Sequence, residues 1–154
     1  MAAYHKENAT EYLVTTRLSG IDASETDLHS DKAAVIRLFA ESLRTLHALE
    51  AEDCPQNWTP ESSIERGRRR VADGPVFTHG DYCMPNILIH DSRLSGNVDL
   101  GYAGLGDPYR DFVSTYYTVR RNLGEEWITP FFEAYGVQID PQKMEWYRWL
   151  HAFG

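Results

Sequence analysis

The sequence predicts an α+β domain that is mainly helical and contains one short β-hairpin. Two observations predict this fold class. Apolar residues recur at helical spacing in several segments, and β-branched runs gather between residues 76 and 100. The chain of 154 residues is long enough for one domain with a single core, and it shows no internal repeat. We therefore treat residues 1–154 as one domain.

The first half of the chain predicts a strand and a long helix. Tyr12 to Leu18 is rich in β-branched and apolar residues and ends at Ser19-Gly20, which is typical of a short strand before a turn. The run DKAAVIRLFAESLRTLHAL, from Asp31, places apolar side chains near one helical face, with Asp31 able to cap the start. His47 lies near that face and is either a ligand or, as is more common there, a core histidine. A loop and a short helix over Pro60 to Val71 follow.

The second half predicts short strands and then helices. The strands are expected at Val76 to Thr78, Ile87 to His90 and Asn97 to Leu100, with a turn at Asp91-Ser92-Arg93. The helices are expected from Asp107 or Pro108 to about Asn122, from about Glu125 to Tyr135, and from Pro141 to Phe153, with Gly124 as a stop. Aromatic residues in the last two helices could stack a ligand, but at helical spacing they are far more often core residues.

The composition excludes several classes of function. Fifteen basic and 23 acidic residues give a net charge of −8, which disfavours nucleic acid and favours a cationic small molecule. Cys54 and Cys83 lack zinc-site spacing and are too few for a disulfide framework, which fits a reducing compartment. No apolar run approaches the roughly 18 residues of a membrane span, and the N-terminus lacks a signal-peptide pattern. We expect a cytoplasmic protein that binds neither membrane nor nucleic acid.

Three polar residues between the predicted strands carry the candidate chemistry. Asn86 comes five positions after Asp81, and Asp99 lies thirteen positions further on. We expect the hairpin to bring Asn86 and Asp99 together, and an amide oxygen with a carboxylate suits Mg²⁺ that also keeps water or phosphate ligands. Asp81 would then orient an attacking hydroxyl and accept its proton. The local alternative is that Asp81 caps a turn and Asn86 satisfies one, because both residue types are common in turns.

The same residues resemble the kinase-like phosphotransferases, and in particular the aminoglycoside 3'-phosphotransferases. His79-Gly80-Asp81 with Asn86 is similar to that family's catalytic loop, and Val98-Asp99-Leu100-Gly101 is similar to its magnesium-binding segment. The resemblance implies a protein-kinase-like C-terminal lobe whose catalytic loop lies within residues 76–101. In that family the histidine supports the loop and is not the base, so His79 is expected to do the same.

The resemblance also implies the reaction and its ligands. It implies transfer of the ATP γ-phosphate, with Mg²⁺, to a hydroxyl of an aminoglycoside-type antibiotic, as in antibiotic resistance. Asp81 would be the catalytic base, and Asn86 and Asp99 would bind the metal. Asp107 and Asp111 are either ligands or, as is more common for such aspartates, caps or loop ties that support the site.

The nucleotide site follows from the same resemblance. The strand near Thr16 to Leu18 would be the hinge whose backbone pairs with adenine, and Leu88 and Val98 would flank the ring.

The parts of a kinase-like N-terminal lobe are not found in this sequence. Lys6 is the only lysine before the hinge-like strand and Gly20 is the first glycine, so a Gly-rich loop and a strand lysine are missing. We therefore expect a remnant hinge strand and linker over 1–20 and a helical lobe over 31–154. The alternative hypothesis is a catalytically incompetent, truncated homologue, or a binding module that forms a homodimer through the surface an N-terminal lobe would cover.

Overall fold

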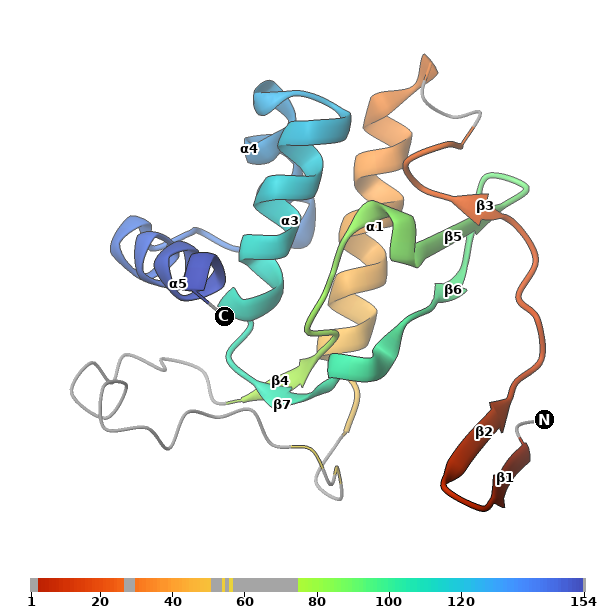
Figure 1. Ribbon diagram of the computed structural model, residues 1–154. Coiled ribbons are helices and arrows are strands. Elements are labelled where there is room, and N and C mark those ends of the chain that lie inside the picture. Colours follow the sequence, from red (N-terminus) through yellow and green to blue (C-terminus); the bar gives the residue numbers. More distant parts are fainter. Residues whose placement is uncertain (1–2, 27–29, 51–53, 55, 57–74, 154) are drawn as a thin grey trace.

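The computed structural model describes residues 3–26, 30–50, 54, 56 and 75–153. Figure 1 shows a helical body with small sheets on one side and below it. The helices are α1 (Lys32–His47), α3 (Tyr109–Asn122), α4 (Ile128–Tyr135) and α5 (Pro141–Phe153). The strands are β1 (Ala3–Glu7), β2 (Thr10–Val14), β3 (Ile21–Asp22), β4 (Val76–Thr78), β5 (Ile87–His90), β6 (Arg93–Asn97) and β7 (Gly104–Gly106). The α+β fold class is confirmed.

Helix α1 packs against α4 and forms one wall of the core. It begins where the sequence predicts, because the Asp31 carboxylate accepts a hydrogen bond from the Ala34 N–H at 3.0 Å. The Phe39 ring stacks on Tyr82 at 4.6 Å between centroids and meets Phe131 of α4 at 5.4 Å. Each such fully buried aromatic side chain stabilises the fold by about 1.5–3 kcal/mol. The core therefore joins α1 and α4 to the loop that contains Tyr82.

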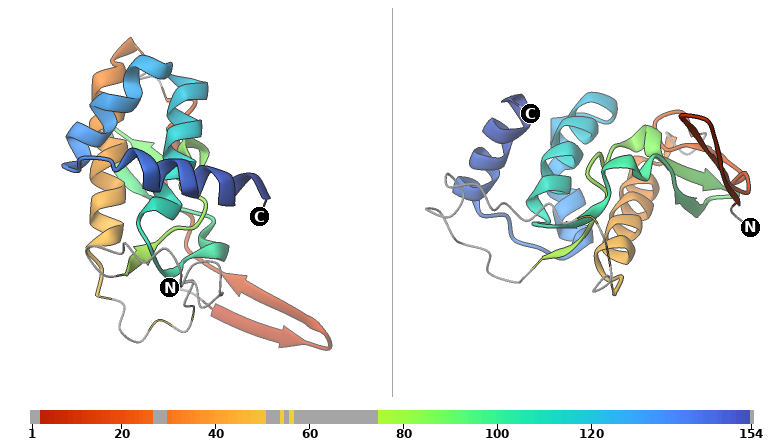
Figure 2. Two further views of the ribbon diagram at one scale, coloured as in Figure 1. Left: turned by 90° about the vertical axis from the view of Figure 1, so that its left-hand side faces the viewer. Right: turned by 60° about the horizontal axis from the view of Figure 1, so that its bottom comes forward.

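Helices α3 and α5 complete the body, and α5 lies across the outer side of α3 in Figure 1 and in the left view of Figure 2. The predicted helix from Pro141 to Phe153 has these bounds in the structure. The segment predicted as one helix from Glu125 to Tyr135 is a 3₁₀ turn at Glu125–Trp127 followed by α4. No helix among the described residues is long and apolar enough to cross a membrane.

The β5–β6 hairpin differs from the prediction in its second strand. The return strand is Arg93–Asn97 and not Asn97 to Leu100. Asp91 and Ser92 have positive φ angles of 49° and 59°, and this tight two-residue turn lets pairing begin at Arg93. Asp99 has a φ of 58°, which ends the extended chain before Leu100. Asp99 therefore follows the hairpin on a turn and is not on a strand.

A second small sheet was not predicted at all. Strand β7 pairs antiparallel with β4, so that Val76 faces Gly106 and Thr78 faces Gly104. The Thr78 hydroxyl also donates to the Gly104 carbonyl at 2.9 Å. The pairing fixes the end of β4, which is the point where the candidate catalytic loop begins.

The N-terminal hairpin β1–β2 projects from the body (Figures 1 and 2). Every residue of both strands is exposed. The predicted strand from Tyr12 to Leu18 is correct only as far as Val14, because the hairpin turn at Asn8 starts β2 at Thr10 and residues 15–19 lie outside the strands. The predicted helix from Pro60 to Val71 lies outside the described residues. The division into segments 1–20 and 31–154 stays a prediction.

Candidate active site

The loop between β4 and β5 is held to the helical body by its alternate residues. The Tyr82 hydroxyl donates to the Phe39 carbonyl at 2.6 Å, and the Met84 N–H donates to the Thr118 hydroxyl at 3.1 Å. Gly80 has a φ of 86°, and a Cβ at that position would lie 2.3 Å from the Tyr102 carbonyl oxygen. Only glycine fits there. The backbone around Asp81 is therefore fixed before any ligand binds.

Asp111 of α3 binds the start of this loop. Its carboxylate is fully buried and accepts hydrogen bonds from the His79 N–H at 2.7 Å and the Gly80 N–H at 2.8 Å. His47 Nε2 of α1 lies 3.0 Å from the same carboxylate. Sequence reasoning treated Asp111 and His47 separately and did not connect them.

Asp81 and Asn86 are in direct contact. The Asn86 Nδ2 donates to the Asp81 backbone oxygen at 3.0 Å and to the Asp81 carboxylate at 3.4 Å. Because the amide nitrogen is used in this way, the amide oxygen of Asn86 is left as the group that can bind a cation. Both residues are half-buried.

Asp99 lies next to this pair in the fold. The N–H of Val98 donates to the Asn86 carbonyl at 2.9 Å, which places the residue before Asp99 beside Asn86. Burial, and then the negative charge of Asp81, raise the pKa of the Cys83 thiol to about 11, with a smaller contribution from Asp99. Both carboxylates therefore act on one thiol, and the structure brings the predicted base and metal ligands into one region.

The donor set at this place suits a metal that keeps other ligands. Within the part of the chain that the structure describes, no group of three or more His, Cys, Asp and Glu side chains could hold a metal ion. One amide oxygen from Asn86 and one exposed carboxylate from Asp99 match the few protein ligands that Mg²⁺ takes when phosphate oxygens and waters supply the rest.

His79 and Asp107 are both buried beside the loop. The His79 Nε2 lies 3.0 Å from the Val98 carbonyl, so the ring connects the catalytic loop to the segment that contains Asp99. The Asp107 carboxylate accepts a hydrogen bond from the Tyr109 N–H at 2.9 Å and forms an ion pair with Lys143 of α5 at 2.7 Å. Neither side chain contacts Asp81 in these interactions.

The four residues predicted to bind adenine come from two segments. Leu88 and Gly96 are cross-strand partners, so they face the same side of the β5–β6 sheet. A Cβ on Gly96 would lie 2.7 Å from the Leu18 side chain, so Leu18 covers that side. Val98 directly follows the end of β6, and its N–H donates to the Asn86 carbonyl. Thr16 lies in the same segment as Leu18, between β2 and β3.

Comparison with known proteins decides the family. Residues 2–74 and 64–149 match the phosphotransferase enzyme family. The chain belongs to this family. The predicted resemblance is therefore confirmed, and the chain is by descent a phosphotransferase enzyme.

Among its relatives, the aminoglycoside 3'-phosphotransferase of Niallia circulans is 28% identical over 93% of this chain and 67% of its own length. An aminoglycoside 3'-phosphotransferase of Escherichia coli is 33% identical over 66% of this chain and 50% of its own length. The solved aminoglycoside phosphotransferase of Streptomyces rimosus, in complex with ADP and streptomycin, has a TM-score of 0.78 and 26% identity, covering 97% of this chain and 72% of that one. The kinase-like fold of these enzymes is thus also the fold of this chain.

Proposed function

We propose that the chain transfers the γ-phosphate of ATP to a hydroxyl of a small molecule, with an aminoglycoside-type antibiotic as the substrate class. The observation that carries the proposal is the contact between Asn86 and Asp81 beside the segment that contains Asp99. These are the side chains that a phosphoryl transfer needs for proton acceptance and for metal binding.

Asp81 is the catalytic base in this proposal. A half-buried carboxylate can accept the proton of a hydroxyl as that hydroxyl attacks phosphorus. The hydrogen bond from Asn86 Nδ2 and the fixed backbone at Gly80 hold Asp81 in one place. Positioning of this kind, together with electrostatic stabilisation, accounts for most of the catalysis in phosphoryl transfer.

Asn86 and Asp99 would hold Mg²⁺ through the amide oxygen and the carboxylate. A bound Mg²⁺ supplies charge neutralisation to phosphate oxygens. Asn86 would then have two roles through two atoms, because its nitrogen donates to Asp81 while its oxygen would bind the metal.

The nucleotide would lie near the side of the β5–β6 hairpin that Leu18 and Leu88 line, with Val98 beside the ring as the family resemblance implies. Leu18 packs over Gly96, where a Cβ would lie 2.7 Å from its side chain, so the ring would rest against apolar side chains. Thr16 and Leu18 would offer backbone groups to the ring edge. The Streptomyces rimosus relative was solved with ADP, which supports a nucleotide site in this fold.

The acceptor is expected to be cationic. The net charge of −8 favours a positively charged small molecule over an anionic one. The names of the relatives from Niallia circulans and Escherichia coli support an aminoglycoside in particular.

The test measures ATP turnover with a panel of aminoglycosides for the wild-type chain and for Asp81→Asn. We expect aminoglycoside-dependent turnover in the wild type and a fall of about 10²- to 10⁴-fold in Asp81→Asn. Asp91→Asn is the matched control, because Asp91 is an exposed aspartate at the β5–β6 turn and should leave turnover unchanged. If the wild type does not exceed the background without enzyme, the enzymatic proposal is wrong.

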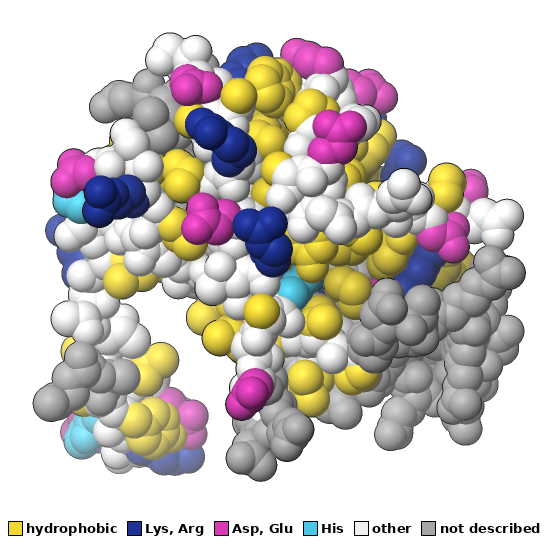
Figure 3. Space-filling view, turned by 180° about the vertical axis from the view of Figure 1, so that it is seen from behind, with side chains coloured by type: hydrophobic (Ala, Val, Ile, Leu, Met, Phe, Trp, Pro, Cys, Tyr) yellow, Lys and Arg dark blue, Asp and Glu magenta, His cyan; other side chains and the backbone are white. Residues whose placement is uncertain are grey.

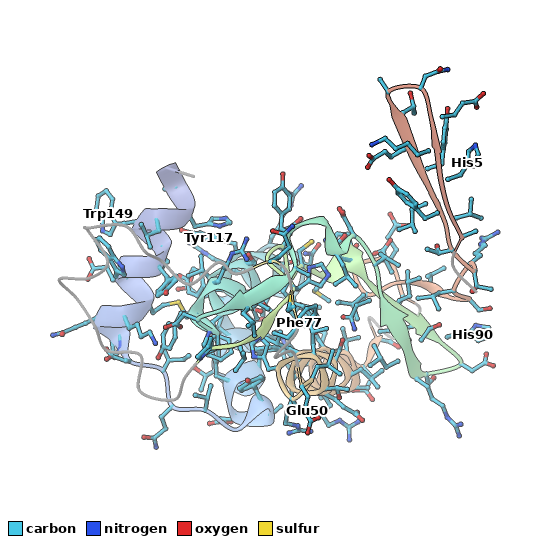
Figure 4. The ribbon with its side chains drawn as sticks, turned by 90° about the horizontal axis from the view of Figure 1, so that it is seen from below. His5, Glu50, Phe77, His90, Tyr117 and Trp149 are labelled. Atoms are coloured by element: carbon cyan, nitrogen blue, oxygen red, sulfur yellow. The ribbon has the colours of Figure 1, made fainter. Side chains whose placement is uncertain are left out.

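One observation favours a second role, which is self-association through the β1–β2 hairpin. Tyr4, Tyr12, Leu13 and Val14 are between 48% and 70% exposed. Figure 3 shows hydrophobic side chains at the surface of the hairpin, and in Figure 4 His5 on β1 lies far from Phe77 of β4. A two-stranded hairpin is marginally stable alone. Size-exclusion chromatography over a range of concentrations tests this role, and a wild type that elutes as a monomer throughout would rule it out.

A further inference from the structure

Tyr102 is an exposed aromatic residue beside the two segments that form the proposed active site. It ends the 3₁₀ turn Leu100–Tyr102, which lies between β6 and β7 in Figure 1. A Cβ added to Gly80 would lie 2.7 Å from the Tyr102 Cβ, so this side chain begins against the residue that precedes Asp81. Tyr102 is nevertheless 61% exposed. Its ring is therefore close to the proposed base and accessible to a ligand.

The same turn passes the proposed metal ligand. Asp99 precedes the turn, and its Oδ1 lies 3.9 Å from the position that a Cβ on Gly101 would take. Gly101 is the residue directly before Tyr102, and consecutive Cα atoms are about 3.8 Å apart. Tyr102 is thus one residue away from the contact with Asp99, and it packs on the residue before Asp81.

The backbone of Tyr102 is held independently of its ring. Arg110 of α3 donates from Nη1 to the Tyr102 carbonyl at 3.0 Å and to the hydroxyl of the buried Thr78 at 3.4 Å. The N–H of Ala103 donates to the Leu100 carbonyl at 3.0 Å and closes the turn. None of these contacts uses the Tyr102 side chain. Substitutions at this position therefore test the ring and not the turn.

The course of the chain separates this turn from the proposed nucleotide surface. That surface lies on the β5–β6 hairpin, whereas the turn leads on to β7, which pairs with β4 in a different sheet. In phosphoryl transfer the attacking and leaving oxygens lie roughly in line, so the acceptor approaches phosphorus from the side opposite to the nucleotide. The attacking hydroxyl has to reach Asp81, and Tyr102 packs next to Asp81. The acceptor is therefore the ligand that the ring can contact.

We propose that Tyr102 is a specificity-determining residue whose ring face binds an ammonium group of a saccharide-like acceptor. The inference rests on the proposed function. An aromatic face attracts a cation that lies within about 6 Å of the ring centre. The carboxylates of Asp81 and Asp99 add to this attraction, and the positive charge of Arg110 is countered by the buried carboxylate of Asp111. The ring thus selects acceptors that carry positive charge beside the reacting hydroxyl.

Three variants separate the ring from its hydroxyl and from apolar packing in general. Tyr102→Phe keeps the ring face and removes only the hydroxyl, whereas Tyr102→Leu keeps an apolar side chain and removes the ring. Trp149→Leu is the matched control, because Trp149 is a similarly exposed aromatic residue, at 57%, on a different element. In Figure 4 it lies on α5, well away from Phe77 of β4.

The first measurement needs no turnover. The full chain, labelled at its tyrosine rings, is titrated by NMR with kanamycin, a saccharide that carries ammonium groups, and with sucrose, which carries none. The Tyr102 signal is identified by its absence in Tyr102→Phe. We expect kanamycin to shift this signal and sucrose to leave it unchanged. A Tyr102 signal that does not move with kanamycin up to about 10 mM, or that moves equally with sucrose, would overturn the inference.

The second measurement divides KM from kcat with kanamycin as the acceptor. We expect Tyr102→Leu to raise KM for kanamycin about 5- to 30-fold while kcat and KM for ATP change less than about threefold, because the lost contact binds the ground state and the transition state alike. Tyr102→Phe and Trp149→Leu should stay within about threefold of the wild type. An equal rise in KM for ATP, or an equal effect of Trp149→Leu, would overturn the role of the ring.

The two measurements also separate the inference from the proposed function. A shift of the Tyr102 signal without any turnover would show that the proposed function is wrong while the ring still binds the cationic saccharide. Turnover of kanamycin with unchanged KM in Tyr102→Leu would show the reverse, because the phosphotransferase activity would stand and the ring would have no part in acceptor binding.

Discussion

The side-chain amide of Asn86 donates to both the backbone oxygen of Asp81, at 3.0 Å, and its carboxylate, at 3.4 Å. One residue therefore orients the proposed base with its nitrogen while its oxygen stays available to a cation. This double use makes substitutions of Asn86 informative, because the two roles respond to different replacements.

The first prediction concerns Asn86→Ala and Asn86→Asp. Asn86→Ala loses both atoms, so we expect the Mg²⁺ concentration at half-maximal turnover to rise about 10- to 100-fold, and kcat to fall as well. Asn86→Asp keeps an oxygen for the metal but places a second carboxylate against Asp81, so kcat should fall while the Mg²⁺ requirement changes less. Turnover measured across a magnesium series distinguishes them. Equal magnesium requirements in Asn86→Ala and the wild type would exclude Asn86 as a ligand.

The second prediction concerns the buried carboxylate of Asp111. Asp111→Ala leaves the N–H groups of His79 and Gly80 without their acceptor in the interior, so we expect the free energy of unfolding to fall by about 3–5 kcal/mol. Urea denaturation followed by tryptophan fluorescence measures it. The control is Asp91→Asn, because the Asp91 side chain is 87% exposed and asparagine tolerates the positive φ of 49° at this turn, so stability should change by less than about 0.5 kcal/mol. Similar values for the two variants would contradict the prediction.

The third prediction concerns the ion pair between Lys143 and Asp107. The two side chains are 17% and 3% exposed and lie 2.7 Å apart, and Lys143 also lies 4.4 Å from the centre of the Tyr109 ring. Lys143→Met leaves a buried charge without its partner, so we expect a loss of about 1–3 kcal/mol in the free energy of unfolding.

Lys6→Met is the comparison for this pair. Lys6 and Glu11 are 2.6 Å apart but 59% and 55% exposed, so solvent screens their attraction and the loss should stay below about 0.5 kcal/mol. The double variant Lys143→Met with Asp107→Asn should recover part of the loss, because it removes the buried charge. No recovery would indicate that Lys143 stabilises through packing on Tyr109 and not through charge.

Local signals predicted the helices well. Asp31 caps α1 as its sequence context indicates, and Gly124 adopts a positive φ of 115° after α3. The β6 strand was misplaced because pairing depends on the turn, and the left-handed conformations of Asp91 and Ser92 are not evident from β propensity. Strand β7 was missed because two of its three residues are glycines, which give no strand signal.

The candidate site was predictable only where its residues form a local motif. Asp81, Asn86 and Asp99 lie within one short stretch, and the resemblance identified them together. The contact between His47 and Asp111 joins positions 64 residues apart and depends on how α1 packs near α3. Periodicity indicates that His47 lies near a buried face, but it carries no information on which residue that face meets.

The fourth prediction concerns the reactivity of Cys83. Burial, followed by the charge of Asp81, raises the pKa of this thiol from 9.0 to about 11, so the proton is held more tightly in the folded chain. The thiolate is the reactive form, and a pKa raised by two units lowers the thiolate fraction at pH 8 by about 100-fold.

In a Cys54→Ser background, alkylation of Cys83 by iodoacetamide should therefore be slow at pH 8 and rise steeply only toward pH 11. Asp81→Asn removes the negative charge that is the second cause of the raised pKa, so the rise in alkylation should occur at a lower pH. Because the folded chain holds this proton more tightly than the unfolded chain does, the contribution of Cys83 to stability is complete below pH 9 and declines as the pH rises through 11. A rise in alkylation centred near pH 9 in both variants would show that neither burial nor Asp81 acts on the thiol.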